Sequence, residues 1–386
     1  MGSPEITSVV IENGSSETRA GFSTEQLPSV VFPSLYAKKG DSFVFGDELY
    51  EVPEEEVFTI LNDGVVYNWD ALEANWRFIY NQLGADPSEQ PLVIAEELWN
   101  NKKNRSKLAE VAFEKLGVPA FAIIKAPMAV SYGVGRSTSI VIDIGSSTTS
   151  VTPIMEGTIL YKGAVHSKYA GDYLNAHVHA FLTQATGTPV ESYFTGSESH
   201  KRLRASERIL TDIKAGVISV STYPIPNAAV EFTVAPKHYE LPNGERIDFG
   251  KEQVLLAEPL FLPANYPLPG APPPQTQPLG LTDLILSSLK KLEANHEVYV
   301  SLLSNIVITG GGSLIEGIEQ RVLSDLARFL PQYSIQSFAT PVFVERKRSV
   351  WTGASILASM NSFESHYIAR EEYRERGDDY LHEKFK

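Results

Sequence analysis

Three glycine-centred segments have the residue types that a phosphate-binding site needs. Residues 10–16 read VIENGSS, residues 141–147 read VIDIGSS, and residues 309–313 read TGGGS. Glycine lets backbone N–H groups approach a phosphate closely, and serine hydroxyls add further donors. The chemistry that these residues could support is nucleotide binding, with or without hydrolysis of the phosphate chain.

The first two segments each begin with an apolar strand and recur at a fixed offset of 131 residues. After each turn the strand pattern continues, as ETRAGF and as TTSVTPI, so each segment predicts a β-hairpin. No GxxxxGK[ST] motif is present, which excludes a P-loop between strand and helix. The faint repeat predicts two halves that are built on the same strand-turn-strand unit.

The third segment lies in residues 305–326, which predict a strand, a triple-glycine turn and an amphipathic helix. Ser313 and Glu316 have the spacing of a capping box, with serine at the N-cap and glutamate at N3. Two interpretations stay open. The segment is either a well-capped tight turn or a place where backbone approaches a nucleotide.

The remaining pattern is that of an α/β protein. Helical periodicity appears in residues 69–83, in residues 104–117, which end at Gly117, and in residues 206–217. The proline-rich residues 262–280 predict a surface loop, and the acidic residues 51–57 predict a solvated face. Alternating helices and strands of this kind favour layered α/β domains.

Length and composition narrow the class of protein. The 386 residues, 43% of them hydrophobic, suffice for two domains with cores of their own. A formal charge of −14 disfavours direct binding of duplex nucleic acid. Without cysteine there is no disulfide or thiolate metal site, and the eight histidines show no metal-ligand spacing. No apolar run suits a signal peptide or a membrane span, so we expect a soluble intracellular protein.

Taken together and in order, these motifs resemble actin and the actin-related proteins over nearly the whole chain. ENGSSETRAGF is similar to the first phosphate loop, DIGSSTTSVTPIMEG to the second, ITGGGSLIEGI to the adenosine turn, and SVWTGASILAS to a connecting helix. The resemblance implies the α/β two-domain fold of the actin, hexokinase and Hsp70 ATPases around a nucleotide cleft. The outer domain would be residues 1–133 plus 349–386, with a reduced second lobe at about 34–64, and the inner domain residues 134–348.

Other segments resemble one branch of that family. VVYNWDALEANWRFIYNQL, HSKYAGDYLNAHVH and VYVSLLSNIVITGGGSLIEGIEQRV look most like the actin-related subunits of fungal SWI/SNF- and RSC-type chromatin remodelers. The resemblance implies a nuclear, non-catalytic subunit that pairs with a second actin-related protein on the helicase-SANT-associated helix of the remodeler ATPase. It would touch the nucleosome only indirectly, with no membrane contact and no homopolymer.

The resemblance also implies a set of nucleotide-binding residues. ATP is expected as a structural ligand that is not turned over; whether Mg²⁺ or Ca²⁺ accompanies it is left open, and no metal ligand is predicted. By resemblance, Glu12 and Ser146 replace two aspartates that lie near the metal ion and its water shell, Ala215 replaces a glutamate and Ile315 a tyrosine, so we expect an affinity for nucleotide that is weaker than that of actin. The alternative is that the glycines serve only the fold. The predicted cofactor-binding residues are Gly14, Ser15, Ser16, Arg19, Asp143, Gly145, Ser146, Ser147, Lys214, Gly310, Gly311, Gly312 and Lys347.

Catalysis is not expected. By resemblance, Ala126 stands where actin has the glutamine that orients the attacking water, and Ser150 where it has a histidine that orders the same water. A methyl group cannot orient water, and loss of a positioned proton-transfer group costs about 10²- to 10⁴-fold in rate. A slow ATPase that acts as a nucleotide switch is the alternative from the enzyme class.

The resemblance further implies a partner-binding surface. A filament component is the cytoskeletal alternative, but the second lobe is short and the proline-rich loop cannot copy the apolar plug of actin. An actin-related subunit of an acetyltransferase or INO80-type complex is another alternative. Leu357 and Met360 could instead be plain core. The predicted partner-binding residues are Tyr132, Gly135, Ser137, Gly157, Leu357, Met360 and Ser362.

Overall fold

The computed structural model describes residues 7–385, which fall into two compact units. Unit 1 takes the described parts of Met1–Val52, Val57–Ser137 and Arg348–Lys386. Unit 2 consists of Pro53–Glu56 and Thr138–Lys347. Among the described residues, no helix combines the length and the apolar character that a membrane span needs.

Unit 1 is built on a six-stranded mixed sheet. The strand order is β19-β10-β9-β1-β2-β3, in which β1 pairs antiparallel with β2 and parallel with β9. Valine, isoleucine and leucine fill β1 and β9, and their side chains are buried because helices cover the sheet. The strands are β1 (Val9–Asn13), β2 (Glu17–Phe22), β3 (Val30–Pro33), β9 (Leu92–Glu96), β10 (Ala120–Lys125) and β19 (Ile368–Ala369).

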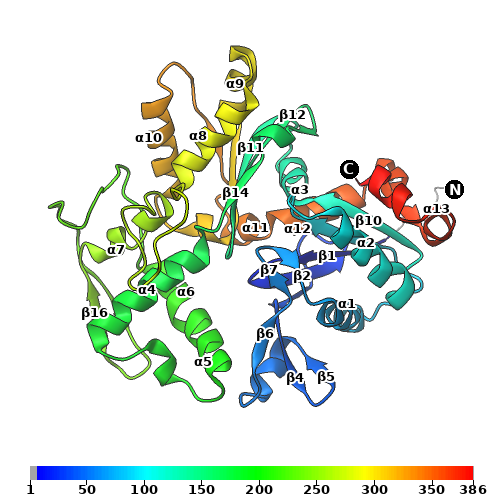
Figure 1. The fold of residues 1–386 in the computed structure, drawn as a ribbon, viewed down its shortest axis with the longest axis horizontal. Helices are drawn as coiled ribbons and strands as arrows, with labels where there is room; N and C mark the ends of the chain where they lie inside the picture. The colour runs from blue at the N-terminus through cyan, green and yellow to red at the C-terminus, as the bar shows by residue number, and fades with distance from the viewer. Residues whose placement is uncertain (1–6, 386) are drawn as a thin grey trace. The chain divides into compact units, whose positions relative to one another are not determined.

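The helices of unit 1 bury large apolar side chains against this sheet, including Trp76 and Trp351. Helix α12 lies beside α3 and β1 (Figure 1). The helix predicted over residues 69–83 is confirmed, with Asn68 as its N-cap. The helix predicted over 104–117 begins earlier and becomes π-helical at Val111–Leu116 before Gly117 ends it. The helices are α1 (Trp69–Leu83), α2 (Lys102–Glu110), α3 (Ala126–Gly133), α12 (Ser349–Ala358) and α13 (Arg370–Lys384).

A small lobe of unit 1 is organised around aromatic side chains. Tyr36, Phe43 and Phe45 lie within 6.4 Å of one another, measured between ring centroids. The order of its sheet is β5-β4-β6, and a separate pair, β7 and β8, follows it. The strands are β4 (Leu35–Lys39), β5 (Ser42–Val44), β6 (Val57–Thr59), β7 (Leu61–Asn62) and β8 (Val65–Val66), with a 3₁₀ turn at Gly46–Glu51.

Unit 2 repeats the strand plan of unit 1, which confirms the predicted internal repeat. Its hairpin β11–β12 is antiparallel, and β17 runs parallel beside β11 as β9 does beside β1. Both predicted hairpins are confirmed, and Asp143 faces Ser150 as Glu12 faces Arg19. The strands are β11 (Ser139–Ile144), β12 (Thr149–Met155), β13 (Thr158–Ile159), β14 (Val165–Ser167), β17 (Ile306–Thr309), β18 (Ser337–Phe338), and the hairpin β15 (Lys237–Glu240) and β16 (Arg246–Phe249).

Helices α8 and α9 pack against the β11–β12 hairpin of unit 2 (Figure 1). The helix predicted over residues 206–217 starts earlier, at Glu198, because the Ser197 hydroxyl caps it there. The proline-rich residues 262–280 form a loop without helix or strand, as predicted. The helices are α4 (Gly171–Thr186), α5 (Glu198–Ala205), α6 (Thr211–Gly216), α7 (Glu252–Leu255), α8 (Leu281–Leu292), α9 (His296–Leu303), α10 (Ile318–Phe329) and α11 (Phe343–Lys347).

The capping box predicted at Ser313 and Glu316 is wrong. The Ser313 hydroxyl donates to the Gly310 carbonyl at 2.7 Å, and α10 starts only after Gly317, whose φ is 91°. Long-range pairing causes the delay, because the Glu316 carbonyl accepts the Val220 N–H at 2.7 Å. The chain therefore stays extended at Ile315, and helical structure begins two residues after the predicted N3 position.

All side chains of the acidic run at residues 51–57 are exposed or half-buried, as predicted. The backbone of Pro53–Glu56, however, belongs to unit 2 and makes hydrogen bonds there. The Ser197 N–H donates to the Pro53 carbonyl and the Ser197 hydroxyl to the Glu55 carbonyl, both at 2.8 Å. The Ser199 hydroxyl donates to the Glu56 carboxylate.

Candidate functional site

The first glycine hairpin holds its own charged residues in a tight arrangement. The Gly14 N–H donates to the Glu17 carbonyl at 3.1 Å, and a Cβ at Gly14 would lie 2.8 Å from that oxygen, so the turn requires glycine. Arg19 stands opposite Glu12 in the β1–β2 register, and its guanidinium donates to both Glu12 and Glu17. Ser15 and Ser16 belong to the same turn.

Glu12 is buried and binds a second element. Burial raises the pKa of its carboxyl, while the Arg19 charge acts in the opposite direction. Its other oxygen, Oε2, accepts the Trp351 backbone N–H at 3.1 Å, in the first turn of α12. Glu12 thus joins the first hairpin to the N-terminus of a helix from the far end of the chain. The sequence had suggested only a metal-shell role for this carboxylate.

The second hairpin lies against the start of α4. The Gly145 N–H donates to the Thr148 carbonyl at 2.9 Å, the same turn as in the first hairpin. The Gly171 N–H donates to the Gly145 carbonyl at 3.0 Å, and the Ser146 hydroxyl donates to the Asp172 carboxylate at 2.7 Å. Sequence reasoning missed Gly171 and Asp172, although a glycine and an acid at a helix start are a readable signal.

The Lys214 side chain extends from α6 to the start of α4, beside the second hairpin. Its ammonium donates to the Gly171 carbonyl at 3.0 Å. Burial lowers the pKa of Lys214 to about 8, and the nearby Asp172 only partly offsets that effect. This buried amine is suited to an anionic ligand, because a negative charge nearby would favour its protonated form.

The triple-glycine turn closes on the second hairpin. Gly310 has a φ of 87°, and a Cβ there would lie 2.2 Å from Asp143 Oδ1. A Cβ at Gly312 would lie 2.5 Å from the Ile144 side chain. The Lys347 side chain lies about 4 Å from the position of a Cβ on Gly311. Only glycine allows this approach, whether or not a ligand is present.

Unit 2 therefore brings most of the predicted cofactor-binding residues together. Their chemistry fits a nucleotide: two partly exposed glycine turns, serine hydroxyls and a buried amine. Within residues 7–385, no group of three or more His, Asp or Glu side chains is placed to hold a metal ion. The unit 2 residues are Asp143, Gly145, Ser146, Ser147, Lys214, Gly310, Gly311, Gly312 and Lys347, while Gly14, Ser15, Ser16 and Arg19 belong to the first hairpin in unit 1.

The two residues that the family resemblance assigns to water orientation are an alanine and a serine. Ala126 begins α3 and is buried, and Ser150 is buried in β12. Next to Ala126, Lys125 pairs with Glu96, which also binds Arg105 at 2.7 Å. Burial lowers the pKa of Lys125, although Glu96 acts against this shift. Sequence reasoning missed this buried cluster, whose members come from three separate elements.

The predicted partner-binding residues divide by exposure. In unit 1, Tyr132 is 44% exposed and Met360 is 40% exposed, and Ile356 of α12 is also exposed. Leu357 is half-buried and packs against the core of unit 1. Gly157 belongs to unit 2, in the turn after β12, with a φ of 76°. The other predicted residues, all exposed in unit 1, are Gly135, Ser137 and Ser362.

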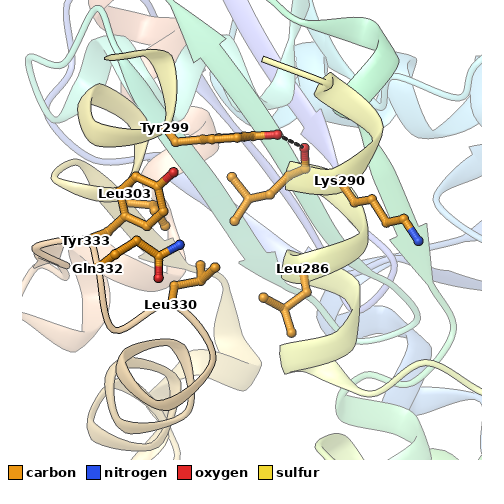
Figure 2. A pocket seen from close by; sticks show the side chains of 8 residues that line it. Leu286, Lys290, Tyr299, Leu303, Leu330, Gln332 and Tyr333 are labelled. Atoms are coloured by element: carbon orange, nitrogen blue, oxygen red, sulfur yellow. Dashed lines mark hydrogen bonds between the residues drawn. The ribbon is translucent and has the colours of Figure 1, made fainter. Parts of the chain in front are cut away.

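Unit 2 also has a small apolar cavity of about 220 Å³ between α8, α9 and the end of α10. Figure 2 shows its side chains, with the Tyr299 hydroxyl donating to the Leu289 carbonyl at 3.1 Å. No predicted site residue lines this cavity. Its lining residues are Leu286, Leu289, Lys290, Tyr299, Leu303, Leu330, Gln332 and Tyr333.

Comparison with known proteins agrees with this geometry. The family model described as Actin matches residues 3–386. Actin-related protein 4 of Yarrowia lipolytica is 32% identical over 99% of this chain and 96% of its own length. The SWI/SNF and RSC complexes subunit arp42 of Schizosaccharomyces pombe is 30% identical over 97% of each chain, and actin-related protein 7 of Saccharomyces cerevisiae is 30% identical over 95% of each. The chain belongs to the actin family.

Proposed function

We propose that this chain is a non-catalytic actin-related subunit of a nuclear, ATP-dependent chromatin-remodeling complex. The observation that carries the proposal is similarity over nearly the full length of both chains to a relative that is named as a subunit of the SWI/SNF and RSC complexes. A similarity without large gaps in coverage supports a shared role better than a shared fold alone would. In this proposal the chain acts by binding other proteins of the complex.

The absence of turnover is part of the proposal. By resemblance to actin, Ala126 and Ser150 stand at the two positions that would orient the attacking water, and they offer only a methyl group and a short hydroxyl. Losses of this kind lower rates by about 10²- to 10⁴-fold. ATP would then be a structural ligand, held by the glycine turns of unit 2 with Lys214 and Lys347. When bound, it would supply negative charge to this amine-bearing site; the accompanying cation, Mg²⁺ or Ca²⁺, is not specified by the residues.

The proposed partners are the helicase-SANT-associated helix of the remodeler ATPase and a second actin-related protein. Exposed apolar side chains on unit 1, Tyr132, Ile356 and Met360, suit the apolar face of a helix. Tyr132 lies on α3, Ile356 on α12, and Met360 directly after α12. The two helices pack closely at Gly353, where a Cβ would lie 1.8 Å from the Ala129 carbonyl oxygen. A rigid base of this kind lowers the entropy lost when a partner binds.

Affinity purification of the full chain from nuclei, followed by mass spectrometry, tests the proposal. We expect to recover a remodeler ATPase and a second actin-related protein. Recovery of acetyltransferase subunits alone, of INO80-type subunits alone, or of a homopolymer would overturn the assignment.

A double variant, Tyr132→Ala with Met360→Ala, tests the surface. Truncation of both apolar side chains should weaken helix binding by roughly 10-fold or more, since truncation of a residue that anchors an interface costs about 1 kcal/mol or more. Tyr223→Ala is the control, because Tyr223 is 71% exposed on unit 2. Equal affinity of the double variant and the control would place the helix elsewhere.

A further inference from the structure

The proline-rich loop of unit 2 is closed at its base. A Cβ at Gly280 would lie 1.8 Å from the Phe261 carbonyl oxygen, so the two ends of the loop lie side by side. In the first half of the loop, the Asn265 side-chain amide and the Tyr266 hydroxyl donate to backbone carbonyls of residues 225–226, both at 2.8 Å. The fold of unit 2 therefore fixes both ends of the loop and its first half.

The second half of the loop, residues 271–277, is exposed along its whole length. A turn precedes it, in which Gly270 has a φ of 75° and the Ala271 N–H donates to the Leu268 carbonyl at 3.1 Å. Among the hydrogen bonds and ion pairs of residues 7–385, none involves residues 272–277. This segment thus leaves its side chains and its carbonyl groups free to contact another molecule.

The composition of this segment favours one backbone conformation. Pro272, Pro273 and Pro274 are consecutive, so each ring fixes φ near −65° and also keeps the residue before it out of the helical region. Such a run favours the polyproline II helix, which rises about 3.1 Å per residue and makes no internal hydrogen bonds. Because this conformation exists before binding, little conformational entropy is lost when a partner takes it up.

The chemistry of the segment indicates the kind of partner. Proline rings are apolar and pack against aromatic side chains, and protein domains with aromatic-lined grooves bind polyproline helices in this way. Residues 259–282 include no charged side chain, although the chain as a whole carries a formal charge of −14. Recognition of this segment therefore depends on ring packing and on the shape of the backbone, and it needs no ion pair.

We propose that residues 271–277 are a binding site for a partner protein domain that recognises polyproline helices through a groove lined with aromatic side chains. The three consecutive prolines fill the groove, and the closed base of the loop holds the segment in place on unit 2. This inference goes beyond the proposed function. It uses none of the residues predicted to bind nucleotide or the helix of the remodeler ATPase, and it does not depend on membership of any complex.

Binding of the full chain to an array of purified WW, SH3 and EVH1 domains tests this inference. We expect at least one domain to bind with a dissociation constant below roughly 100 μM. Its affinity should change by less than about 2-fold between about 50 and about 500 mM salt, because no charged side chain of the segment takes part. The double variant Pro272→Ala with Pro273→Ala should weaken this binding by roughly 10-fold or more, since alanine releases the fixed φ angles and removes two rings.

A second double variant is the matched control. Pro331→Ala with Pro341→Ala removes two exposed prolines of unit 2 that lie outside the loop, and it should leave the affinity unchanged. Both double variants should melt as the wild type does, because all four positions are exposed. The inference is overturned if no domain of the array binds, if the loop variant binds as well as the wild type, or if the control variant loses as much affinity. Complex membership is measured separately by purification, so failure of one proposal leaves the other readable.

Discussion

The Glu12 carboxylate and the Trp351 backbone N–H are joined by a hydrogen bond of 3.1 Å, although 339 residues separate them. The Trp351 indole N–H also donates to the Val10 carbonyl at 3.0 Å. These two bonds fasten the first glycine hairpin to the start of α12. Since α12 also carries Ile356 and Leu357, the hairpin and the proposed partner surface share one support within unit 1.

Removal of the Glu12 charge should destabilise unit 1 strongly. Glu12→Gln leaves Arg19 buried beside a single carboxylate and weakens the acceptor for α12, so we expect a loss of about 3–5 kcal/mol. Urea denaturation of the wild type and the variant measures this loss in the free energy of unfolding. Glu73→Gln is the matched control, because its ion pair with Arg77 lies on a partly exposed helix face and should contribute less than about 1 kcal/mol. Equal losses in the two variants would show that Glu12 has no special role.

A single methyl group at Gly353 should disturb the contact between α3 and α12. The added Cβ would overlap the Ala129 carbonyl at 1.8 Å, so Gly353→Ala must push the helices apart, at a cost of about 1–3 kcal/mol or more. In Gly216→Ala the Cβ meets nothing within 4 Å at the end of α6, and stability should stay within about 1 kcal/mol. Thermal melts of the wild type and of both variants measure these changes in stability. A Gly353→Ala protein as stable as the wild type would contradict the close packing described for α12.

Phosphate release should stay at the background level. In a single-turnover assay with labelled ATP, the wild type, alone or with its partner, should release phosphate no faster than buffer does. Ser150→Ala should behave identically, because the buried serine orients no water in this proposal. A wild-type rate above background that Ser150→Ala lowers would restore the ATPase interpretation.

Stability should rise with pH in the window set by Lys214. Burial holds the pKa of this amine at about 8 in the folded chain, against an ordinary value of 10.5. The unfolded chain therefore binds more protons between about pH 8 and 10.5, so the free energy of unfolding increases across that range. Below pH 8 the folded chain carries the full free-energy cost of burying the protonated Lys214 amine. Lys214→Met removes it and should flatten the slope of stability against pH, whereas Lys291→Met, an exposed position of unit 2, should not. Identical slopes in all three proteins would mean that Lys214 is not buried in solution.

Local patterns in the sequence determined much of this fold. The two hairpins, helix α1 and the proline-rich loop follow from strand alternation, helical periodicity and turn residues, each readable within about 15 residues. The repeat at residues 10–16 and 141–147 predicted two halves with one plan, because the same short pattern makes the same turn. The clustering of Asp143 with Gly310 was expected only through family resemblance.

Only the tertiary structure determined the features that depend on contacts between residues far apart in the sequence. The start of α10 moved to Gly317 because Glu316 pairs with Val220, and Lys125 met Glu96 and Arg105 only when three elements packed together. Glu12 had been considered for a metal shell, but the fold surrounds it with Arg19 and the Trp351 N–H. Whether a carboxylate faces a ligand or a neighbouring side chain depends on residues far away in the chain, and only the packed structure brings those residues within hydrogen-bonding distance.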